Sequence, residues 1–477
     1  MNLVIPLSRQ GEPLFRQIYL GLRQAILSGA LRSSDQLPST RELAEQLQVS
    51  RTVVLLAYDQ LLAEGFVSGH RGSGTYVSAG LNLNAHKEKE LSAKLRLSQF
   101  GQIAAEISPT VVFPKRRSSP LRYDFAYGRS NIESFPFEAW RRILLRNARE
   151  APVRDLDYGS PAGSSDLQEA ISAHVRRSRA VVCDPSQVMI VSGSQQALDL
   201  VARVLLERGE RVAIEDPQYQ GARQILLAAG IRLYPVPVDR DGLIIQKLPG
   251  KARAAFVTPS HQFPTGAVLT LSRRLELLAW AKRQNAIIVE DDYDGEFRYD
   301  GQPLESLQGL DPEGRVIYIG TFSRTIFPSL RIGYLIAPKS LVPAFSAAKW
   351  LCDRHTATLE QRTLAEFIAN GMYERCLHRI RRKNALRREV MLHAIHKYIG
   401  VRAEITGDGA GAHLVLWANH RASEKAIVQQ AGSRQVGVYG ISPYFLKPSS
   451  RTGIMLGYSR LKEADITEGI RRLGEVF

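Results

Sequence analysis

The sequence has few cysteines and no long apolar run, and both shortages narrow what the protein can be. Its three cysteines, Cys183, Cys352 and Cys376, are far apart, so they form neither a CxxC zinc pair nor an even disulfide framework. No run of about eighteen apolar residues is present, which argues against a membrane span. The first residues have no basic segment followed by an apolar stretch, so no secretory signal is expected. We expect a cytoplasmic protein with reduced thiols and no metal site.

Acidic residues are scarce relative to basic ones. Lys and Arg total 63 against 47 Asp and Glu, which gives a formal net charge of +16 over 477 residues. The composition is otherwise that of a globular protein, with 44% hydrophobic and 23% charged residues, and the length allows two to four domains. The surplus favours a polyanionic partner without identifying it, because basic surfaces also serve solubility and phosphate binding.

Residues 1–78 have the pattern of three short helices followed by a hairpin. Apolar residues recur at helical spacing over residues 13–29. Ser39-Thr-Arg-Glu42 is a capping box that begins a second helix, and Ser50 is suited to cap a third. Two helices joined by a short turn predict a helix-turn-helix, and the glycine-rich segment 69–74 between two strand-like runs predicts a wing.

The string LPSTRELAEQLQVSRTVVLLAYDQLLAEGFVSGHRGSGTYVS closely resembles the winged helix-turn-helix of the GntR family of bacterial transcription regulators. The resemblance implies double-stranded operator DNA as a partner. It implies phosphate contacts at the start of the second helix, base contacts at the start of the third, and a phosphate or minor-groove contact from the wing. The simpler alternative for any one residue is a solvated polar cap. The candidate DNA-binding residues are Ser39, Thr40, Arg41, Ser50, Arg51, Thr52, Arg71, Gly72 and Gly74.

The positive surplus does not lie in this first unit. Residues 1–78 contain seven arginines, no lysine and six acidic residues. Residues 374–397 contain eight basic residues and two acidic ones. That run is either a second electropositive surface or, as the simpler interpretation, a solvated helix face.

Residues 79–120 lose this regular pattern and end in a proline-, serine- and base-rich stretch, which predicts a linker of roughly forty residues. From residue 121 to 477, apolar strand-like runs alternate with helical periods, typical of a mostly parallel sheet covered by helices. Ligands of such sheets bind at the carboxyl ends of the strands. The residues that follow each run are therefore the candidates for a binding site.

Polar and aromatic residues follow several of the predicted strands. A glycine turn at residues 192–198 leads into a helix, whose N-terminus is suited to phosphate. Tyr219 offers an aromatic face, and Asp291-Asp-Tyr293 places a carboxylate two residues before a phenol. Thr321-Phe-Ser323-Arg324 and Arg331 add hydroxyl and guanidinium groups, which bind phosphate. The set fits one phosphorylated cofactor with a protonated ring nitrogen.

These segments, among them YGSPAGSSDLQEAI, VSGSQQALDL, VTPSHQFPTG, VEDDYDGEFRY and GTFSRTIFPSLRIGYLIAP, resemble the fold type I aminotransferases that use pyridoxal phosphate. With the leading winged helix, the whole chain resembles the MocR-like subgroup of the GntR family. The resemblance implies an α/β fold, with a large domain over residues 121–477 that ends in a small α+β lobe. It also implies a head-to-tail homodimer and a small-molecule effector.

The same resemblance assigns roles to individual residues. The cofactor phosphate would be held by Gly193, Ser194, Gln195, Thr321, Ser323 and Arg331. Tyr219 would stack on the ring, Asp291 would pair with its nitrogen, and Tyr293 would donate to its hydroxyl group. Tyr158 would come from the neighbouring subunit. Phe263 occupies a position where many aminotransferases have asparagine, while His261 and Gln262 follow the regulator pattern.

Arg324 departs from the family at the position with the most chemistry. Aminotransferases have a lysine there, whose amine forms a Schiff base with the cofactor and carries the substrate proton. A guanidinium group stays protonated and is a poor nucleophile. Lys282 and Lys339 lie outside the motif and are not expected to replace that lysine.

The arginine that binds the substrate carboxylate in many aminotransferases has no clear counterpart either. Ile454 and Met455 stand near its expected place, and Arg451 is only nearby. We therefore expect a degenerate aminotransferase fold with no catalytic residue.

Three interpretations of the site remain. It binds pyridoxal phosphate or an amine adduct of it non-covalently, it binds another anionic ligand through Arg324, or it is an empty dimerisation scaffold. The function predicted from the sequence is a DNA-binding transcription regulator that senses a small ligand. The alternatives are an active aminotransferase with a DNA-binding appendage and a ligand-independent repressor.

Overall fold

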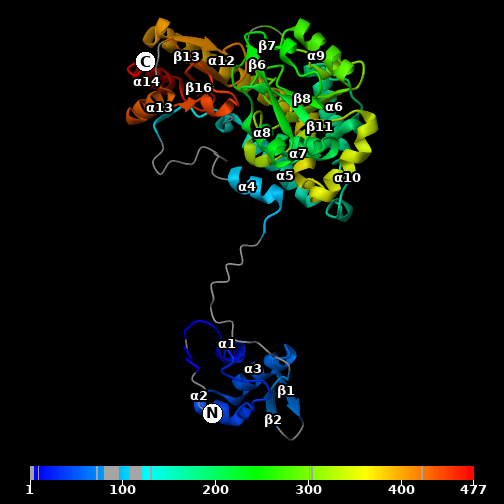
Figure 1. Ribbon diagram of the computed structural model, residues 1–477, viewed down its shortest axis with the longest axis vertical. Coiled ribbons are helices and arrows are strands. Elements are labelled where there is room, and N and C mark those ends of the chain that lie inside the picture. The colour runs from blue at the N-terminus through cyan, green and yellow to red at the C-terminus, as the bar shows by residue number, and fades with distance from the viewer. Residues whose placement is uncertain are drawn as a thin grey trace. The chain divides into compact units, whose positions relative to one another are not determined.

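The computed structural model describes residues 5–8, 10–70, 74–79, 96–107, 121–128, 131–299, 301, 304–419 and 423–477 (Figure 1). The chain divides into two compact units, Met1–Arg96 and Leu97–Phe477. In the described ranges, no helix has both the length and the apolar character needed to cross a membrane. The Arg71 and Gly72 predictions lie outside the described residues.

The first unit is a three-helix bundle followed by a hairpin. Its elements are α1 (Leu14–Leu27), α2 (Thr40–Leu47), α3 (Arg51–Ala63), β1 (Val67–His70) and β2 (Gly74–Val77), and the two strands pair antiparallel. The predicted capping box is present, because the Glu42 amide donates to the Ser39 hydroxyl at 3.2 Å and the Ser39 amide donates to the Glu42 carboxylate at 2.8 Å. Ser50 is the N-cap residue of α3, although its side chain makes no capping hydrogen bond to the residues described.

Apolar residues of this unit meet in one core. Leu22 of α1, Leu43 of α2 and Val54 of α3 are fully buried, and Val67 and Val77 close the core from the hairpin. The polar residues at the start of α3, Arg51 and Thr52, remain exposed. The winged helix-turn-helix predicted from the sequence is confirmed.

The second unit is built on an eight-stranded mixed sheet with the order β4-β11-β10-β9-β8-β5-β6-β7. Neighbouring strands from β10 through β6 are parallel, whereas β11 and β7 are antiparallel to their neighbours. The strands are β4 (Val188–Val191), β5 (Arg211–Asp216), β6 (Arg232–Asp239), β7 (Gly242–Leu243), β8 (Ala254–Val257), β9 (Ile287–Asp292), β10 (Val316–Thr321) and β11 (Gly333–Ile336).

Helices cover both faces of this sheet, because alternate residues of each strand point to opposite sides (Figure 1). Val188 and Ile190 pack in the cluster that contains α5, α6, α11 and α12, whereas Met189 and Val191 pack in the cluster with α7, α8 and α10. A further cluster places α9 against β5, β8 and β9. The helices are α5 (Phe137–Glu150), α6 (Ser165–Arg179), α7 (Ser194–Leu205), α8 (Gln220–Ala228), α9 (Leu271–Gln284), α10 (Val342–Asp353), α11 (Thr358–Ala369) and α12 (Met372–Tyr398).

A smaller lobe follows at the C-terminus. Its antiparallel sheet has the order β12-β13-β16-β15, and a short parallel pair joins β14 to β3 near residue 123. Its elements are β3 (Tyr123–Asp124), β12 (Ala403–Thr406), β13 (His413–Ala418), α13 (Glu424–Ser433), β14 (Val436–Gly437), β15 (Tyr439–Gly440), β16 (Gly453–Gly457) and α14 (Glu463–Leu473). The predicted α/β class with a small α+β lobe is confirmed.

One helix lies inside the range predicted as linker. Residues 99–107 form α4 (Gln99–Ile107), which belongs to the second unit and contacts α8. Residues 79–120 were predicted as a linker, with no helix of defined bounds.

Candidate functional site

The carboxyl ends of β4, β9 and β10 bring together most of the residues predicted to hold a cofactor. β9 and β10 run parallel, with Asp291 in register with Ile319. β4 and β10 both pair antiparallel with β11, which lies between them, so the two strands end at the same edge of the sheet. The loops after these strands therefore lie at one edge, as the alternation of strands and helices predicted.

One part of this edge is suited to a phosphate group. Gly193, with φ of +90°, precedes α7, whose first amides have no acceptor within the helix. Arg331 donates from Nη2 to the Ser192 carbonyl at 2.6 Å, and a Cβ atom on Gly193 would lie only 3.0 Å from that guanidinium nitrogen. The Thr321 hydroxyl donates to Ser323 Oγ at 3.1 Å across the same edge. Amides, a guanidinium and two hydroxyls thus gather around one position.

Gln195 and Tyr219 form a second part of the edge. The Tyr219 hydroxyl donates to Gln195 Oε1 at 3.2 Å, and Gln195 Nε2 donates to the Gly221 carbonyl at 3.3 Å. The Tyr219 ring packs edge-on against Phe263, with their centroids 6.0 Å apart. Tyr219 therefore offers a fixed aromatic surface beside the phosphate-binding position.

Asp291 carries a buried oxygen without a partner. Its Oδ1 atom is inaccessible and makes no hydrogen bond to any described residue. Burial raises the pKa of this carboxyl from 3.8 to about 7, and the negative charges of Asp292 and Asp294 add to the shift. Burial likewise raises the pKa of Glu215 to about 7, against hydrogen bonds from Thr258 and Gln262. A protonated ring nitrogen at Asp291 would satisfy both the free oxygen and the local excess of negative charge.

Tyr293 is hydrogen-bonded to His261, a residue that the sequence pattern did not single out as part of the site. His261 Nδ1 lies 2.9 Å from the Tyr293 hydroxyl and 3.0 Å from Asp294 Oδ2. Burial lowers the pKa of His261, but the charge and hydrogen bond of Asp294 outweigh it, and the pKa is raised above 6.5. The residue pattern gave no signal for Asp294, because an acidic residue after Tyr293 reads as an ordinary turn.

His261, Asp294 and His413 also form a compact set of possible metal ligands, with donor atoms within 4.8 Å of one another. Hydrogen bonds already engage them, since His413 Nε2 lies 3.1 Å from the Pro264 carbonyl oxygen and His261 Nδ1 contacts Asp294. Burial holds the pKa of His413 well below 6.5. We interpret the set as hydrogen-bonded support for Tyr293.

Arg324 stands at the same edge. Its guanidinium carbon lies 5.8 Å from the centroid of the Tyr293 ring, and its charge acts to lower the pKa of Asp291. A Cβ atom on Gly128 would lie 3.0 Å from Arg324 Nη1, so the side chain reaches toward the loop after β3. Within the described part of the chain, this guanidinium forms no hydrogen bond or ion pair.

The lysines named as possible substitutes lie in other contacts. Lys282 Nζ pairs with Glu313 at 2.6 Å, and Lys339 pairs with Asp184. Both side chains are mostly exposed. A third amine, Lys349, is buried in α10 and pairs with Asp353 at 2.5 Å. None of the three belongs to the group of residues around Asp291 and Tyr293.

Arg451 is not brought to this edge. Its Nη2 pairs with Glu404 at 2.5 Å, and its guanidinium carbon lies 4.7 Å from the Trp417 ring centroid. Met455 of β16 is instead buried with Phe263, Trp417 and Tyr444 in an aromatic cluster that Tyr127 and Tyr293 contact. An apolar wall therefore lines the C-terminal lobe beside the site.

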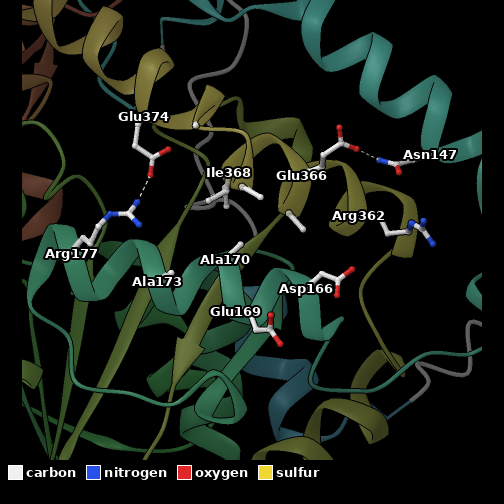
Figure 2. A pocket seen from close by; sticks show the side chains of 13 residues that line it. Asn147, Asp166, Glu169, Ala170, Ala173, Arg177, Arg362, Glu366, Ile368 and Glu374 are labelled. Atoms are coloured by element: carbon white, nitrogen blue, oxygen red, sulfur yellow. Dashed lines mark hydrogen bonds and ion pairs between the residues drawn. The ribbon is translucent and has the colours of Figure 1, made fainter.

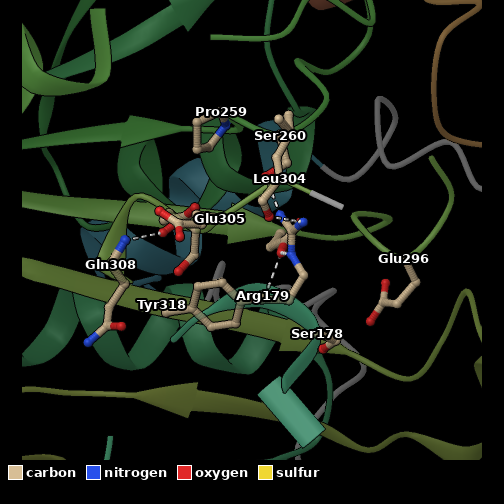
Figure 3. A network of polar contacts seen from close by, with 12 residues as sticks. Ser178, Arg179, Pro259, Ser260, Glu296, Leu304, Glu305, Gln308 and Tyr318 are labelled. Atoms are coloured by element: carbon tan, nitrogen blue, oxygen red, sulfur yellow. Dashed lines mark hydrogen bonds and ion pairs between the residues drawn. The ribbon is translucent and has the colours of Figure 1, made fainter. Parts of the chain in front are cut away.

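A buried ion pair joins α6 to the last residue of β9. Arg179 Nε pairs with Asp292 Oδ2 at 2.7 Å, and both side chains are 3% exposed. The Tyr318 hydroxyl donates to the same carboxylate oxygen at 2.6 Å. Figure 3 shows Arg179 also donating toward Leu304 and Ser260. This network ties α6 to β9 and β10, and so positions the neighbouring Asp291.

Tyr158 lies on an exposed apolar patch, where its ring contacts His355 and Arg354. Its side chain is 78% exposed, and the neighbouring Leu156 and Leu351 are 62% and 77% exposed. The Arg354 guanidinium joins the two segments, because it lies 5.6 Å from the Tyr158 ring and 4.2 Å from the Trp350 ring. A hollow of about 340 Å³ opens beside Tyr158 and is also lined by residues 355 and 357–360.

Another hollow, of about 770 Å³, lies between α6 and the helices α11 and α12 (Figure 2). Alanines 170, 173, 365 and 369 contribute to its lining. Figure 2 shows Glu374 facing Arg177, which donates to it at 2.8 Å, and Glu366 facing Asn147. These carboxylates are paired within the unit, and the residues predicted from the sequence as ligand contacts do not line this hollow.

In the first unit, the predicted DNA-binding residues converge at the N-termini of α2 and α3. Arg51 Nε donates to Thr40 Oγ1 at 3.2 Å, which joins the two helix starts. Arg41 is exposed, and among the described residues it pairs with Glu45, four positions along α2. Gly74 begins β2 with φ of +104°. Ser39, Ser50, Arg51 and Thr52 are likewise exposed.

The two units define a class of protein in which a winged helix-turn-helix is joined to an aminotransferase fold. Residues 14–77 match the family described as "Bacterial regulatory proteins, gntR family", and residues 124–473 match "Aminotransferase class I and II". Among solved structures, the chain is similar to a kynurenine aminotransferase of Pyrococcus horikoshii, with 27% identity, a TM-score of 0.71 and coverage of 83% of this chain and 97% of the other. The chain is also similar to the α-aminoadipate aminotransferase LysN of Thermus thermophilus, with 29% identity, a TM-score of 0.70 and coverage of 80% of this chain and 98% of the other.

Curated relatives match over nearly the full length. The probable rhizopine catabolism regulatory protein MocR of Rhizobium meliloti is 37% identical over 98% of this chain and 94% of its own length. The pyridoxine biosynthesis transcriptional regulator PdxR of Corynebacterium glutamicum is 32% identical over 92% and 90%. The chain belongs to the MocR-like transcription regulators of the GntR family, which carry an aminotransferase class I and II domain.

Proposed function

We propose that this regulator binds pyridoxal phosphate, or an amine adduct of it, non-covalently in the second unit, and that the bound ligand controls DNA binding by the first. One observation supports this proposal above all. Residues suited to hold the cofactor lie together at one edge of the sheet, and residue 324 at that edge is an arginine. Groups for phosphate, ring face and ring nitrogen are all present, while the position of the family's reactive amine is held by Arg324.

The residues at this edge fit the proposed ligand. The unpartnered Oδ1 of Asp291 would accept a hydrogen bond from the protonated ring nitrogen. Tyr293, supported by His261, would donate to the ring hydroxyl, and Tyr219 would stack on the ring face. The phosphate group would be held by Gly193, Ser194, Gln195, Thr321, Ser323 and Arg331.

We propose that the unit does not catalyse transamination. When bound in an aminotransferase, the cofactor withdraws electrons from the substrate and a lysine amine moves the proton. Arg324 cannot supply that amine, because its guanidinium stays protonated at ordinary pH. Its charge beside Tyr293 is instead available to an anionic group of the ligand. The names of the relatives support a regulatory role, since MocR and PdxR are both called regulators.

The DNA-binding half of the proposal rests on the exposed helix starts of the first unit. Ser39, Thr40 and Arg41 would contact phosphates, because the α2 N-terminus presents free amides and a positive dipole end there. Arg51 and Thr52 would reach base edges in the major groove, with Ser50 beside them. Because its partner is operator DNA, we place the protein in the cytoplasm.

We further propose a head-to-tail homodimer that buries the patch around Tyr158. Contiguous exposed apolar surface of this kind marks an interaction site. Val153, Leu156, Tyr158 and Leu351 are all more than 60% exposed in the single chain, which favours burial against a second copy. In that dimer Tyr158 would complete the neighbouring subunit's cofactor site.

Ligand binding would act on DNA by changing the balance between two arrangements of the dimer. The small C-terminal lobe, which contributes Met455 and Tyr444 beside the site, is the element we expect to close on the ligand. Such a shift requires that the ligand bind one arrangement more tightly than the other. The effect on DNA would then be reciprocal, with operator DNA changing the affinity for the ligand by the same factor.

Calorimetric titration of the full chain with pyridoxal phosphate and with pyridoxamine phosphate tests the ligand half. We expect saturable binding that Arg331→Met weakens, and no covalent label after borohydride reduction. Absence of binding would favour a ligand-independent repressor, whereas a reducible covalent attachment or repeated conversion of an amino acid to its keto acid would favour an active aminotransferase. For the DNA half, Arg51→Ala and Thr52→Ala should each weaken operator binding at fixed salt, and Arg16→Ala on α1 serves as a matched control.

A further inference from the structure

Three leucines of α3, the helix expected to enter the major groove, are exposed. Leu55 and Leu56 near its start are 45% and 49% exposed and Leu62 near its end is 50% exposed, whereas Val54, Ala57 and Tyr58 on the other side are buried in the core. A single exposed leucine is ordinary on a protein surface. The position of Leu55 relative to the polar residues of α3 gives it a more specific meaning.

Leu55 is a surface neighbour of both residues proposed to touch bases. It follows Arg51 by four positions and Thr52 by three, and residues at these spacings lie side by side on a helix. The Arg51 side chain is in turn joined to Thr40, so this face continues onto the start of α2. Leu56 follows Thr52 by four positions but Arg51 by five, so it adjoins only one of these two residues. This face of α3 therefore presents the Arg51 guanidinium, the Thr52 hydroxyl and the apolar Leu55 side chain next to one another.

A negative charge follows on the same face, three positions before the exposed Leu62. Asp59 follows Leu55 by four positions and is exposed. A carboxylate repels DNA phosphates, so we expect the contact with DNA to end before the third turn of α3. Leu55 is thus the last residue of this face that lies within reach of the base edges.

The chemistry of a leucine side chain selects one kind of base edge. Leucine has no hydrogen-bonding group, so placing it against a purine N7, a purine O6 or a cytosine amino group would strip water from a polar atom without replacing it. The C5-methyl group of thymine is the apolar feature of the major groove. Contact between Leu55 and this methyl group removes two apolar surfaces from water together.

We propose that Leu55 reads thymine through its methyl group. Each half-site then has a thymine close to the base pairs that Arg51 and Thr52 contact, at a distance of about one turn of α3, or about 5.4 Å. The inference rests on the proposed DNA binding by α3, and it names a base that this binding requires. Leu55 is on this view a specificity-determining residue, whereas Leu62, which lies beyond Asp59 near the end of α3, is not.

The test begins with duplexes selected from a random library by the full-length chain. Each thymine of a selected duplex is then replaced by uracil, which keeps the base pairing and lacks the methyl group. We expect one position per half-site at which uracil weakens binding roughly fourfold, the effect of burying about one methyl group. With Leu55→Ala that difference should disappear. Leu55→Met, which keeps an apolar side chain, should retain it, and so should the matched control Leu62→Ala, a similarly exposed leucine of α3 beyond Asp59.

The outcomes separate this inference from the proposed function. If no duplex is selected, DNA binding itself fails, and the inference fails with it. If duplexes are selected but no thymine is sensitive to loss of its methyl group, or Leu55→Ala keeps the sensitivity, only the inference is overturned. If Leu55→Ala leaves DNA binding intact and instead dissociates the dimer, the leucine contacts protein and the inference is also overturned. Circular dichroism of each variant verifies that the helices remain folded.

Discussion

The guanidinium of Arg324 lies over the ring of Tyr293, with 5.8 Å between the guanidinium carbon and the ring centroid. The same charge acts to lower the pKa of Asp291, at the end of the strand that precedes Tyr293. A fixed cation thus stands among the groups that would hold the ring of the cofactor. A guanidinium is a poor nucleophile, so Arg324 is not suited to form an imine with an aldehyde.

Arg324→Lys should restore covalent attachment. A lysine amine at this position can form an imine with the aldehyde of pyridoxal phosphate, which borohydride reduction converts into a stable bond. Mass spectrometry of the reduced protein should then find the label on residue 324. Arg324→Gln, which removes the charge without adding an amine, is the control and should remain unlabelled. A label on the unaltered chain would contradict the role given to Arg324.

Asp291→Asn should change how stability depends on pH. Because burial raises the pKa of Asp291 from 3.8 to about 7, the folded protein binds a proton that the unfolded chain has lost. The free energy of unfolding contributed by this group therefore falls as pH rises from about 4 to about 7. The variant should lose this part of the decrease in stability, and at pH 8 its free energy of unfolding should be higher by up to about 4 kcal/mol.

The same variant should bind pyridoxal phosphate more weakly, because asparagine cannot balance the charge of a protonated ring nitrogen. Thermal unfolding over a series of pH values and calorimetric titration measure the two effects. A variant with unchanged pH dependence would show that Asp291 is ionised in the folded protein well below pH 7. Unchanged ligand affinity would separate Asp291 from the ring nitrogen.

Leu351→Asp should dissociate the proposed dimer. Leu351 is 77% exposed in the single chain, next to the Trp350 and Tyr158 rings that Arg354 contacts. Burying a leucine contributes about 2 kcal/mol and an uncompensated carboxylate costs more, so the dissociation constant should rise roughly 100-fold or more. Sedimentation velocity measures the change. Val401→Asp replaces an apolar residue that is 91% exposed elsewhere and should leave the dimer intact.

Arg179→Met should strongly destabilise the second unit. The change leaves Asp292 as a buried charge without its cation, which costs about 3–5 kcal/mol of unfolding free energy. Arg203→Met removes a mostly exposed partner of Asp199 and should cost about 1 kcal/mol or less. All four tryptophans lie in the second unit, so their fluorescence during urea denaturation reports this difference. Equal losses in the two variants would show that the Asp292 charge is balanced by other groups.

Local patterns in the sequence predicted the elements of the fold well. The capping box at Ser39 and Glu42 is present because both of its hydrogen bonds form within one helical turn. The buried strands β9 and β10 follow from runs of apolar residues long enough for one strand each. The candidate site at the ends of β4, β9 and β10 followed from a general property of parallel sheets and from the resemblance to aminotransferases.

Other features depend on partners far apart in the chain and had no local signal. His261 supports Tyr293 only because Asp294 and the loop at residue 261 meet in the folded unit. The basic run at residues 374–397 was interpreted as a solvated or electropositive face. Within it, however, Arg387 is buried and donates to the Ser459 carbonyl, and Arg381 donates to the Glu296 carbonyl. Charge counts alone cannot show such internal pairing.

The amino-acid sequence by itself determined where the helices and strands lie, which class of DNA-binding unit begins the chain, and that residue 324 carries a guanidinium. Each of these depends on neighbours along the chain or on the side chain's own chemistry. The tertiary structure decided that Arg451 pairs with Glu404 while Met455 lines the site, and that Arg51 reaches Thr40. Such pairs form only when separate elements pack, because the packing sets which polar groups lose water and must find a partner.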